Sequence, residues 1–214
     1  IDAGPEPALI DRCLQKLRIK RVPLLLFTHA HADHVDGAAG AVRGRKVGLV
    51  AFGPTGAPPL DQTARTELVA GQALRIGPAK LEVLWPGPTT REVTADEFND
   101  LSLVVRVELA GRRMLFTGDL GEQAQRALAR ANPDLSADVL KVAHHGSADQ
   151  WPELLDRVGP AIALIGVGAG NTHGHPTESA LAELRKRQIS TWRTDLAGDV
   201  AVVDHAKGLA VLTR

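Results

Sequence analysis

The residues best suited to chemistry lie in one short segment, 28–34, which reads Thr-His-Ala-His-Ala-Asp-His. Alternate side chains of an extended chain point the same way, so His29, His31 and Asp33 can converge while His34 turns to a neighbouring point. Imidazole and carboxylate groups are ligands for zinc, manganese or iron. The segment therefore predicts a metal site in which one ion takes His29 and His31 and a second ion takes Asp33 and His34.

A nearly continuous apolar run over residues 22–28 leads into this segment and is typical of a strand buried on both faces. Further strands are expected over 46–52, 81–84, 102–109, 113–117, 138–142 and 161–167, near 191, and over 200–203 and 209–212. Helices are expected over 5–17, 35–42, 121–131, 151–158 and 177–187, while 53–72 reads as the least regular stretch. The alternation predicts an α/β fold with two sheets packed face to face and helices outside.

The composition sets limits on the class of protein. A length of 214 residues fits one domain, and 25 basic residues balance 25 acidic ones, so a nucleic-acid surface would need local basic patches. The longest apolar run is far shorter than the roughly 20 residues that span a bilayer. The single cysteine, Cys13, excludes an internal disulfide. We expect the first helix to turn one face inward, and the residues of that face are Leu9, Cys13, Leu14 and Leu17.

The start of the chain, Ile-Asp-Ala-Gly, reads as the end of a strand that enters a glycine turn. We therefore expect residues 1–214 to form a single domain that is a fragment of a longer chain and lacks its own first strands. No low-complexity linker or domain boundary is apparent within the chain.

The pattern His-x-His-x-Asp-His with a glycine shortly after resembles the signature of the metallo-β-lactamase superfamily. The first four residues resemble the first motif of that superfamily, and Phe-Thr-Gly-Asp ending at Asp119 resembles its bridging-aspartate motif. The resemblance implies an αββα sandwich of two mixed β-sheets flanked by helices, and two metal ions bridged by Asp119. Superfamily members draw a final metal ligand from a histidine after a strand. Here that implies His144 first and His175 second, with His145 and His173 facing the substrate or supporting the ligands.

A histidine that the superfamily usually supplies is missing, because none lies between His34 and His144. The third imidazole for the first metal normally comes just before the bridging aspartate, where this chain has Asn-Asp-Leu-Ser-Leu-Val over 99–104. A β-lactamase, a glyoxalase or a tRNA-processing enzyme of this fold would be expected to have that histidine. The sequence therefore favours another branch.

Several segments together resemble the C-terminal domain of the ComEC family of competence proteins, the DNA-uptake channels of bacterial membranes. They are Asn-x-x-Ser-Leu-Val from Asn99, Leu-Phe-Thr-Gly-Asp, Ala-Asp-Val-Leu-Lys-Val-Ala-His-His-Gly-Ser around Lys141, Gly-His-Pro, and Arg-Thr-Asp-x-x-Gly from Arg193. The match spans essentially the whole chain. Many members have aspartate where this chain has His31, which makes this site softer and leaves zinc and manganese both open.

The resemblance implies metal-dependent cleavage of DNA, in which one strand is degraded as the other enters. Two divalent ions, manganese or zinc, would activate water for in-line attack on phosphorus, with Asp33 orienting that water. His145 or His175 would protonate the departing oxygen. The expected phosphate contacts are Asn99, Ser102, Lys141 and Arg193.

Basic runs at 43–46, 112–113 and 185–187 are further candidates for phosphate contacts, although a solvated surface is the plainer interpretation of each. With no base-reading motif, DNA binding should be independent of sequence and sensitive to salt. The implied partners are DNA and the membrane channel region of the same polypeptide, with no membrane contact by this domain's own residues. The implied location is the extracytoplasmic face of the bacterial cytoplasmic membrane.

Two alternatives stay open. One is a free-standing hydrolase of the same fold that acts on a small phosphodiester or a choline ester. The other is a non-catalytic domain that uses a metal-bearing cleft to guide DNA. Loss of DNA cleavage in EDTA and in Asp119→Ala would support the nuclease hypothesis, whereas DNA binding without turnover would support the guiding domain.

Overall fold

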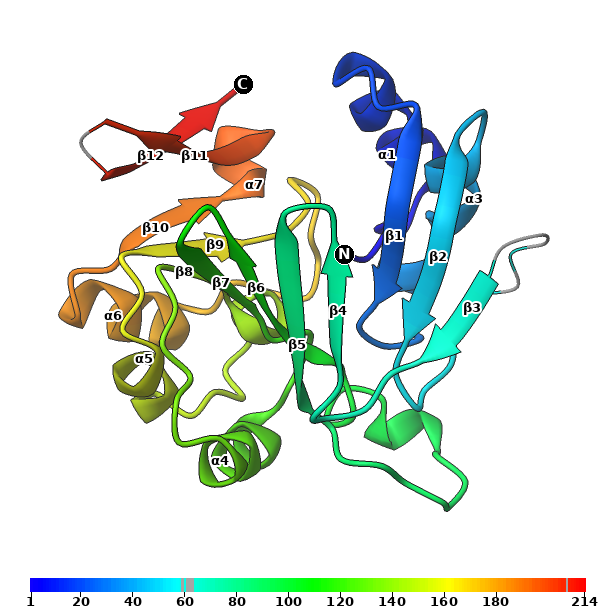
Figure 1. Cartoon of the computed structure of the whole chain (residues 1–214). Coiled ribbons are helices and arrows are strands. Elements are labelled where there is room, and N and C mark those ends of the chain that lie inside the picture. The colour runs from blue at the N-terminus through cyan, green and yellow to red at the C-terminus, as the bar shows by residue number, and fades with distance from the viewer. Residues whose placement is uncertain (59, 61–63, 207) are drawn as a thin grey trace.

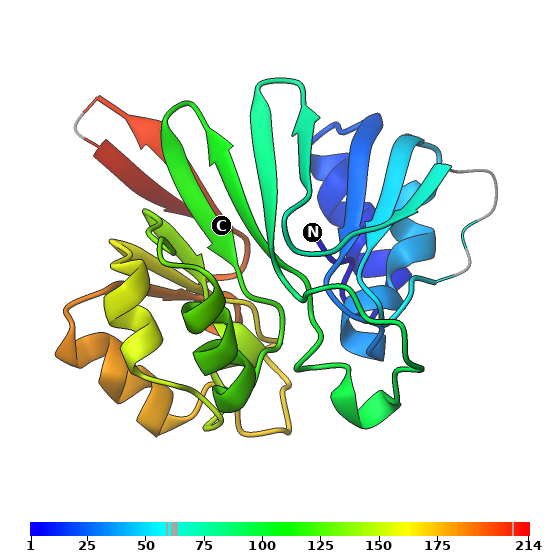
Figure 2. The ribbon, with the colours of Figure 1, turned by 60° about the horizontal axis from the view of Figure 1, so that its bottom comes forward.

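The computed structural model shows two β-sheets that face each other, with helices on both outer sides (Figure 1). Turning the molecule brings the layers into view as helices, sheet, sheet, helices (Figure 2). The structure describes residues 1–58, 60, 64–206 and 208–214. The αββα sandwich expected from the sequence is therefore confirmed.

The smaller sheet is parallel throughout its described strands, in the order β1 (Arg21–Phe27), β2 (Lys46–Phe52) and β3 (Ala64–Glu67). Its outer face is covered by α1 (Pro7–Lys16), α2 (Ala32–Val35) and α3 (Ala38–Val42). Leu25 and Phe27 of β1 pack in the cluster formed with these helices, whereas Leu26 packs in the cluster between the two sheets. Strand β1 is thus buried on both faces at its C-terminal half, as its apolar run predicted.

The larger sheet is mixed, and its strands lie in the order β10-β9-β8-β7-β6-β5-β4. Its antiparallel part comprises β4 (Ala73–Ile76), β5 (Ala79–Trp85), β6 (Val104–Leu109) and β7 (Arg112–Phe116). From β7 onward neighbouring strands are parallel: β8 (Val139–Lys141), β9 (Ile162–Ile165) and β10 (Ser190–Arg193). The outer helices are α4 (Glu122–Ala131), α5 (Glu153–Val158) and α6 (Glu178–Lys186).

Alternation along β6 shows how the larger sheet is held between two cores. Val104 packs with residues of α4 and α5, while Val105 packs in the cluster between the sheets. Both side chains are completely buried. The sandwich therefore fixes the ends of β1, β7 and β8 relative to one another through packing on both faces.

Short elements complete the chain. They are the 3₁₀ turns η1 (Ala95–Glu97) and η2 (Ala143–Gly146), the short helix α7 (Thr194–Ala197), and the antiparallel hairpin β11 (Val200–His205) and β12 (Gly208–Thr213). None of the helices within the described ranges is long and apolar enough to cross a bilayer.

Helix α1 buries only part of the expected face: Leu14 packs, together with Ile10, in the cluster formed with β1 and α3. Leu9 and Leu17 are 47% and 64% exposed and Cys13 is only partly buried, whereas Asp11 is buried. The reason is an ion pair, in which Asp11 binds the guanidinium of Arg45 at 2.9 Å, and the Arg45 side chain is itself almost fully buried. The helix turns this pair inward, so the apolar residues Leu9 and Leu17 remain at the surface.

The stretch 53–72, expected to be irregular, contains β3, and β4 follows directly after it. Both strands are short and carry polar residues in Ala-Arg-Thr-Glu and Ala-Leu-Arg-Ile, so neither has the apolar run that marks a buried strand. Positions 59 and 61–63 of this stretch lie outside the described residues.

Candidate metal centre

The candidate site lies where β1, β7 and β8 end, at one edge of the sandwich. His29 to His34 follow β1, Asp119 follows β7, and the pair His144 and His145 follows β8. Carboxyl ends of parallel strands commonly form binding sites, because the loops that leave them gather at one edge. Within the described chain the imidazole rings form a row of neighbours, in the order His31, His29, His34, His145, His144, His175 and His173.

Four side chains form a compact group that can hold a metal ion: Asp33, His34, Asp119 and His145. One ligand atom from each lies within 4.8 Å of all the others. The Oδ2 atom of Asp119 is 3.3 Å from Nε2 of His34 and 3.4 Å from Nε2 of His145. The same His145 nitrogen is 3.2 Å from Oδ2 of Asp33. We call this group the aspartate–histidine cluster.

The electrostatics of the cluster favour a cation. Burial lowers the pKa of His34, but hydrogen bonds to Asp119 and Asp2 outweigh burial and raise that pKa to about 10. Burial also lowers the pKa of His145, but hydrogen bonds to Asp119 and Asp33 outweigh burial and raise that pKa to about 9. Burial raises the pKa of Asp119, yet hydrogen bonds from the same imidazoles hold it well below its usual value. The carboxylates thus attract positive charge strongly enough to keep both imidazoles protonated when no metal competes.

An unsatisfied oxygen shows that these residues fit a metal ion. Asp119 is 2% exposed, and its Oδ1 atom is buried without a hydrogen-bond partner in the described part of the chain. Leaving a buried acceptor unsatisfied costs about 1–3 kcal/mol, and more when it is charged. Imidazole nitrogens and carboxylate oxygens at such spacing are a suitable donor set for a divalent ion of the zinc, manganese or iron type.

Both imidazoles of the cluster are held by hydrogen bonds on their second nitrogen. Nδ1 of His34 lies 3.0 Å from Oδ2 of Asp2, and Asp2 also accepts hydrogen bonds from the amide and hydroxyl of Thr28. Nδ1 of His145 hydrogen-bonds the carbonyl oxygen of Gly166. Such partners fix the tautomer and ring orientation of a histidine that binds metal, and here they leave Nε2 of both residues facing Asp119.

His29 and His31, expected to bind the first ion, form a separate pair beside the cluster. Nε2 of His29 lies 3.1 Å from Nδ1 of His31, and the two rings meet edge to face. His29 is completely buried, and burial together with the charge of His34 lowers its pKa to about 3. Its imidazole is therefore neutral at physiological pH. The assignment of His29 with His31 to one ion and of Asp33 with His34 to another stays a prediction, and the compact group that the structure shows contains Asp33 and His34.

The structure places His145, and not His144, in the aspartate–histidine cluster. Nε2 of His144 is 4.0 Å from Asp119, while its ring lies beside that of His175, at 5.2 Å between centroids. Both His144 and His145 have positive φ, at 45° and 52°. Consecutive non-glycine residues in this region are strained and turn the two side chains in different directions. The expectation that His144 is the first choice of ligand stays a prediction, and its ring lies outside the compact group because of a turn that sequence spacing does not reveal.

His175 is held close to the same turn. Its following residue, Pro176, packs so tightly on Gly146 that a Cβ at Gly146 would lie 2.7 Å from the proline Cβ. Thr177 donates its amide and its hydroxyl to the carbonyl of Gly146. The predicted site histidines 144, 145 and 175 are therefore brought together, with His175 partly exposed beside His144.

Ser102 has a different role from the expected phosphate contact. It is completely buried, and its hydroxyl accepts the amide N–H of Asp119 at 3.2 Å. Gly118 has φ of +53°, and a Cβ there would lie 2.4 Å from the Cβ of Ser102. The Gly-Asp turn thus fits directly against Ser102. Ser102 therefore positions the backbone of Asp119, and its burial makes it inaccessible to a substrate. Sequence spacing could not show this burial.

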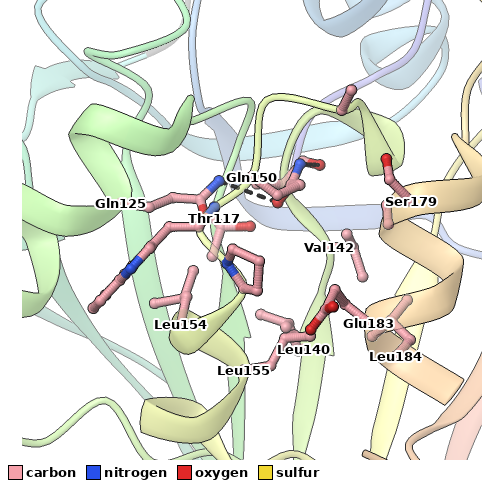
Figure 3. A pocket seen from close by; sticks show the side chains of 15 residues that line it. Thr117, Gln125, Leu140, Val142, Gln150, Leu154, Leu155, Ser179, Glu183 and Leu184 are labelled. Atoms are coloured by element: carbon pink, nitrogen blue, oxygen red, sulfur yellow. Dashed lines mark hydrogen bonds between the residues drawn. The ribbon is translucent and has the colours of Figure 1, made fainter. Parts of the chain in front are cut away.

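A buried glutamine that the sequence analysis missed links the loops that carry Asp119 and His145. Gln125 of α4 donates to the side chain of Gln150 (Figure 3). It also donates to the carbonyl of Leu120 and accepts the amide N–H of Trp151. Gln150 in turn donates to the carbonyl of Ala143, next to the histidine pair. Gln125 is completely buried, so all of this hydrogen bonding is internal. A glutamine in a helix gives no sequence signal for such a role.

The other expected substrate contacts lie at varied positions. Lys141 ends β8, its Nζ donates to the carbonyl of Val142, and its charge lowers the pKa of Asp119. Asn99 has a buried Oδ1 without a partner among the described residues. Arg193 binds Asp195 through Nε and Nη2, so its guanidinium is held within its own segment. All three stay candidates.

The basic runs proposed as phosphate contacts are largely occupied by ion pairs. Arg112 binds Asp204, and Arg113 binds Asp134. In the last run Arg187 binds Asp156 and Glu183, and Arg185 binds Glu178. Arg45 of the first run is buried against Asp11. The paired arginines of these runs therefore have structural partners, whereas Arg43, Lys46 and Lys186 remain exposed, and phosphate contacts by these runs stay a prediction.

Comparison of the sequence with family models identifies the family of the chain. Residues 1–168 match the family model of the metallo-beta-lactamase superfamily, and the chain belongs to that superfamily. Its members are generally metal-dependent hydrolases, and the aspartate–histidine cluster lies where their shared motifs predict a metal centre.

Two competence proteins are similar in sequence. ComE operon protein 3 of Bacillus subtilis is 32% identical over 198 residues, which cover 85% of this chain and 24% of that protein. Competence protein ComA of Neisseria gonorrhoeae is 30% identical over 182 residues, which cover 84% of this chain and 25% of that protein. The chain thus spans about a quarter of the length of these curated relatives.

Solved structures share the fold at low sequence identity. Zinc-bound PqqB from Methylobacterium extorquens has a TM-score of 0.57 at 12% identity, covering 90% of this chain and 80% of that one. The diiron β-hydroxylase CmlA from Streptomyces venezuelae has a TM-score of 0.56 at 15% identity, covering 91% of this chain and 45% of that one. These likenesses confirm the fold.

Proposed function

We propose that this chain is a metal-dependent phosphodiesterase that degrades DNA, and that it forms one domain of a longer DNA-uptake protein. The observation that carries the proposal is the aspartate–histidine cluster, a donor set for divalent metal at the edge of a metallo-β-lactamase fold. Similarity to two competence proteins supports DNA as the substrate. By the same reasoning the partner is the membrane channel region of that protein, and the location is the extracytoplasmic face of the membrane.

The exposure of the cluster suits a polymeric substrate. Asp119 and His34 lie beneath the surface, each with a side chain 3% exposed, whereas the Asp33 side chain is 53% exposed. His144 and His175 extend the row of imidazoles along the same edge. A phosphodiester backbone can approach such an open edge without entering a closed pocket. Binding through phosphates alone would be independent of base sequence.

The side chains have distinct proposed roles. His34, Asp119 and His145 would hold one divalent ion together with Asp33, and His29 with His31 would hold a second. When bound, such ions polarise the phosphodiester and make water a stronger nucleophile. The exposed carboxylate of Asp33 would orient the attacking water and accept its proton. As the new bond to phosphorus forms, the opposite P–O bond breaks, and His175 would give a proton to the departing oxygen.

The test is cleavage of end-labelled single-stranded and double-stranded DNA by the purified chain with Mn²⁺ or Zn²⁺. We expect cleavage with at least one of these ions, none in EDTA, and a loss of at least about 100-fold in Asp119→Ala. His205→Ala is the matched control, because His205 lies in the hairpin strand β11. This variant should retain activity.

Three outcomes would contradict the proposal. Undiminished cleavage by Asp119→Ala would mean that another site carries the activity. Metal and DNA binding without turnover under any divalent ion would instead identify a DNA-guiding domain. Hydrolysis of a small phosphodiester or a choline ester with no cleavage of DNA would identify a small-molecule hydrolase.

A further inference from the structure

An unusual surface lies at the opposite end of the smaller sheet from the metal centre, and we call it the basic end. Its exposed residues come from the end of α1, the loop to β1, the starts of β1 and β2, and the end of α3: Lys16, Leu17, Arg18, Ile19, Lys20, Arg21, Arg43 and Lys46. The amide N–H of Lys46 donates to the carbonyl of Lys20, and the guanidinium of Arg45 donates to the carbonyl of Ile19. These bonds join the segments into one continuous surface.

Positive charge is concentrated at the basic end. Residues 12–32 contain five lysines and arginines and residues 37–60 contain three, and neither segment contains an acidic residue. The chain as a whole has 25 basic and 25 acidic residues, so these two segments carry an excess of positive charge that the rest of the chain balances. The nearby carboxylates are Asp11, which is occupied by Arg45 and Arg43, and Asp199, which lies 3.8 Å from Lys16.

Large apolar side chains are exposed among these charges. Leu17 is 64% exposed and Ile19 is 37% exposed, and they alternate with basic residues in the sequence Lys-Leu-Arg-Ile-Lys-Arg over 16–21. Leu9, on the same helix α1, is 47% exposed. Protruding apolar residues surrounded by lysine and arginine are typical of surfaces that bind at the interface of an anionic bilayer.

We propose that the basic end docks on an anionic lipid bilayer. Leu17 and Ile19 would enter the interface between head groups and acyl chains, and the surrounding lysines and arginines would bind lipid phosphates. DNA would also attract the charges, but it offers no place for exposed leucine and isoleucine. Residues 5–26 contain no aromatic side chain on which bases could stack. The bilayer therefore matches both the charge and the apolar residues.

Docking in this way would orient the metal centre. Strand β1 begins at Arg21 in the basic end and finishes at Phe27, two residues before His29. Seven residues of strand span about 20 Å, so the metal centre would face the aqueous side, away from the lipid. The inference concerns a surface and does not depend on the substrate. It revises the expectation that this domain's own residues make no membrane contact.

The test is co-sedimentation of the metal-loaded chain with vesicles of neutral phosphatidylcholine or of phosphatidylcholine with phosphatidylglycerol. We expect binding to the anionic vesicles only. Arg18→Glu with Lys20→Glu should weaken that binding about tenfold or more. Leu17→Gln with Ile19→Gln, which leaves the charge unchanged, should weaken it several-fold. The matched control is Arg130→Glu with Arg157→Glu, an equal charge change at exposed positions of α4 and α5, which should bind as the unmodified chain does.

Metal content and thermal melting of each variant establish that it is folded, because the basic end lies far from the metal ligands. Absence of binding to anionic vesicles by the folded chain would overturn the proposal, as would equal binding to neutral vesicles. Loss of binding in the charge variant but not in the apolar variant would also overturn it. If that charge variant in addition lost binding to single-stranded DNA, the basic end would be a nucleic-acid surface.

Discussion

The Nε2 atoms of His34 and His145 lie 3.3 Å apart, although 111 positions separate the two residues in the chain. Both nitrogens also contact the same oxygen of Asp119. His34 follows a strand of the smaller sheet and His145 follows a strand of the larger one, so the contact joins the two halves of the sandwich. Two imidazoles that converge on one carboxylate form a strong arrangement for holding a cation.

We predict that divalent metal stabilises the folded chain, because the ligands come together only after folding. At a metal concentration 100 times the Kd, the stabilisation would be about 2.7 kcal/mol. Thermal melts with Mn²⁺ or Zn²⁺ and with EDTA measure this difference. His145→Ala should lose most of the metal-dependent rise in Tm, whereas His205→Ala should keep it. An equal rise in both variants would contradict the prediction.

Metal binding should release protons at neutral pH. The pKa values of His34 and His145 are raised to about 10 and about 9, so both imidazoles are protonated at pH 7.5 in the metal-free chain. A metal ion must displace these protons, which means that its apparent affinity falls as the pH falls. Calorimetric titration in buffers of different ionisation enthalpy counts the protons. We expect about two per ion, and a binding enthalpy that is independent of the buffer would contradict this.

The stability of the metal-free chain should fall as the pH rises, whereas its affinity for metal should increase. Because folding raises the pKa of His34 and His145, their contribution is fully present below the unfolded value of about 6.5. It is lost as the pH rises from there through 9 and 10. Thermal melts in EDTA should therefore show a falling Tm across this range. The fall in Tm with rising pH should be smaller in His145→Gln. An equal fall in the unmodified chain and in this variant would contradict the raised pKa of His145 as its cause.

Asp2 is predicted to tune the metal site through His34 without binding the metal itself. Asp2→Asn removes the negative charge that the Nδ1 side of His34 faces, while it preserves the size of the side chain. Loss of such a partner typically weakens metal affinity about 10-fold to 100-fold. Competition with a chromophoric chelator measures this affinity. Asp36→Asn, at an exposed residue just after α2, serves as the control and should show the affinity of the unmodified chain.

Gln125 is predicted to fix the loop that carries Asp119 and the loop that carries His145 relative to each other. Gln125→Leu removes its hydrogen bonds and leaves buried partners unsatisfied, so the free energy of unfolding should fall by about 1–3 kcal/mol. Metal affinity should fall as well, because the two loops carry ligands. Urea unfolding and chelator competition measure the two effects. Gln123→Leu, at an exposed position of the same helix, should change neither, and a drop in stability without any change in metal affinity would refute the link between the loops.

Arg45 is predicted to stabilise the fold and not to bind DNA. Its side chain is 4% exposed and binds Asp11, so Arg45→Ala would leave a buried carboxylate without its main partner. Removing one partner of a buried pair is destabilising, so Arg45→Ala should lower the free energy of unfolding more than Arg43→Ala does. The neighbouring Arg43 is 61% exposed, and Arg43→Ala should cost under about 1 kcal/mol. Urea unfolding of both variants compares them, and equal losses would show that burial does not distinguish these arginines.

Much of the fold could be predicted because its signals are local. Strand β2 has the bounds expected from its apolar run, and the strands leading to Asp119 and to the histidine pair lie within a few residues of their expected positions. Dense ligand-type residues after β1 likewise marked the site. By contrast, the polar strand β3 has no such run, and the inward face of α1 depends on the Asp11–Arg45 pair, which spacing cannot reveal.

The details of the candidate site depended on three-dimensional contacts. The different directions of the His144 and His145 side chains follow from two successive residues with positive φ, and no residue type announces that conformation here. The role of Ser102 follows from its burial beneath the Asp119 turn. Gln125 acts through partners on two distant loops, which a linear pattern does not show. Ligand types could thus be predicted, whereas their partners could not.

The most direct test of the metal centre is a metal titration that compares His145→Ala with His144→Ala. These neighbours differ in that His145 belongs to the aspartate–histidine cluster and His144 lies outside it. We predict that His145→Ala weakens the binding of one ion by at least about 100-fold, while His144→Ala retains the affinity and stoichiometry of the unmodified chain. The reverse result, with binding lost in His144→Ala and kept in His145→Ala, would contradict the assignment of the metal to this cluster.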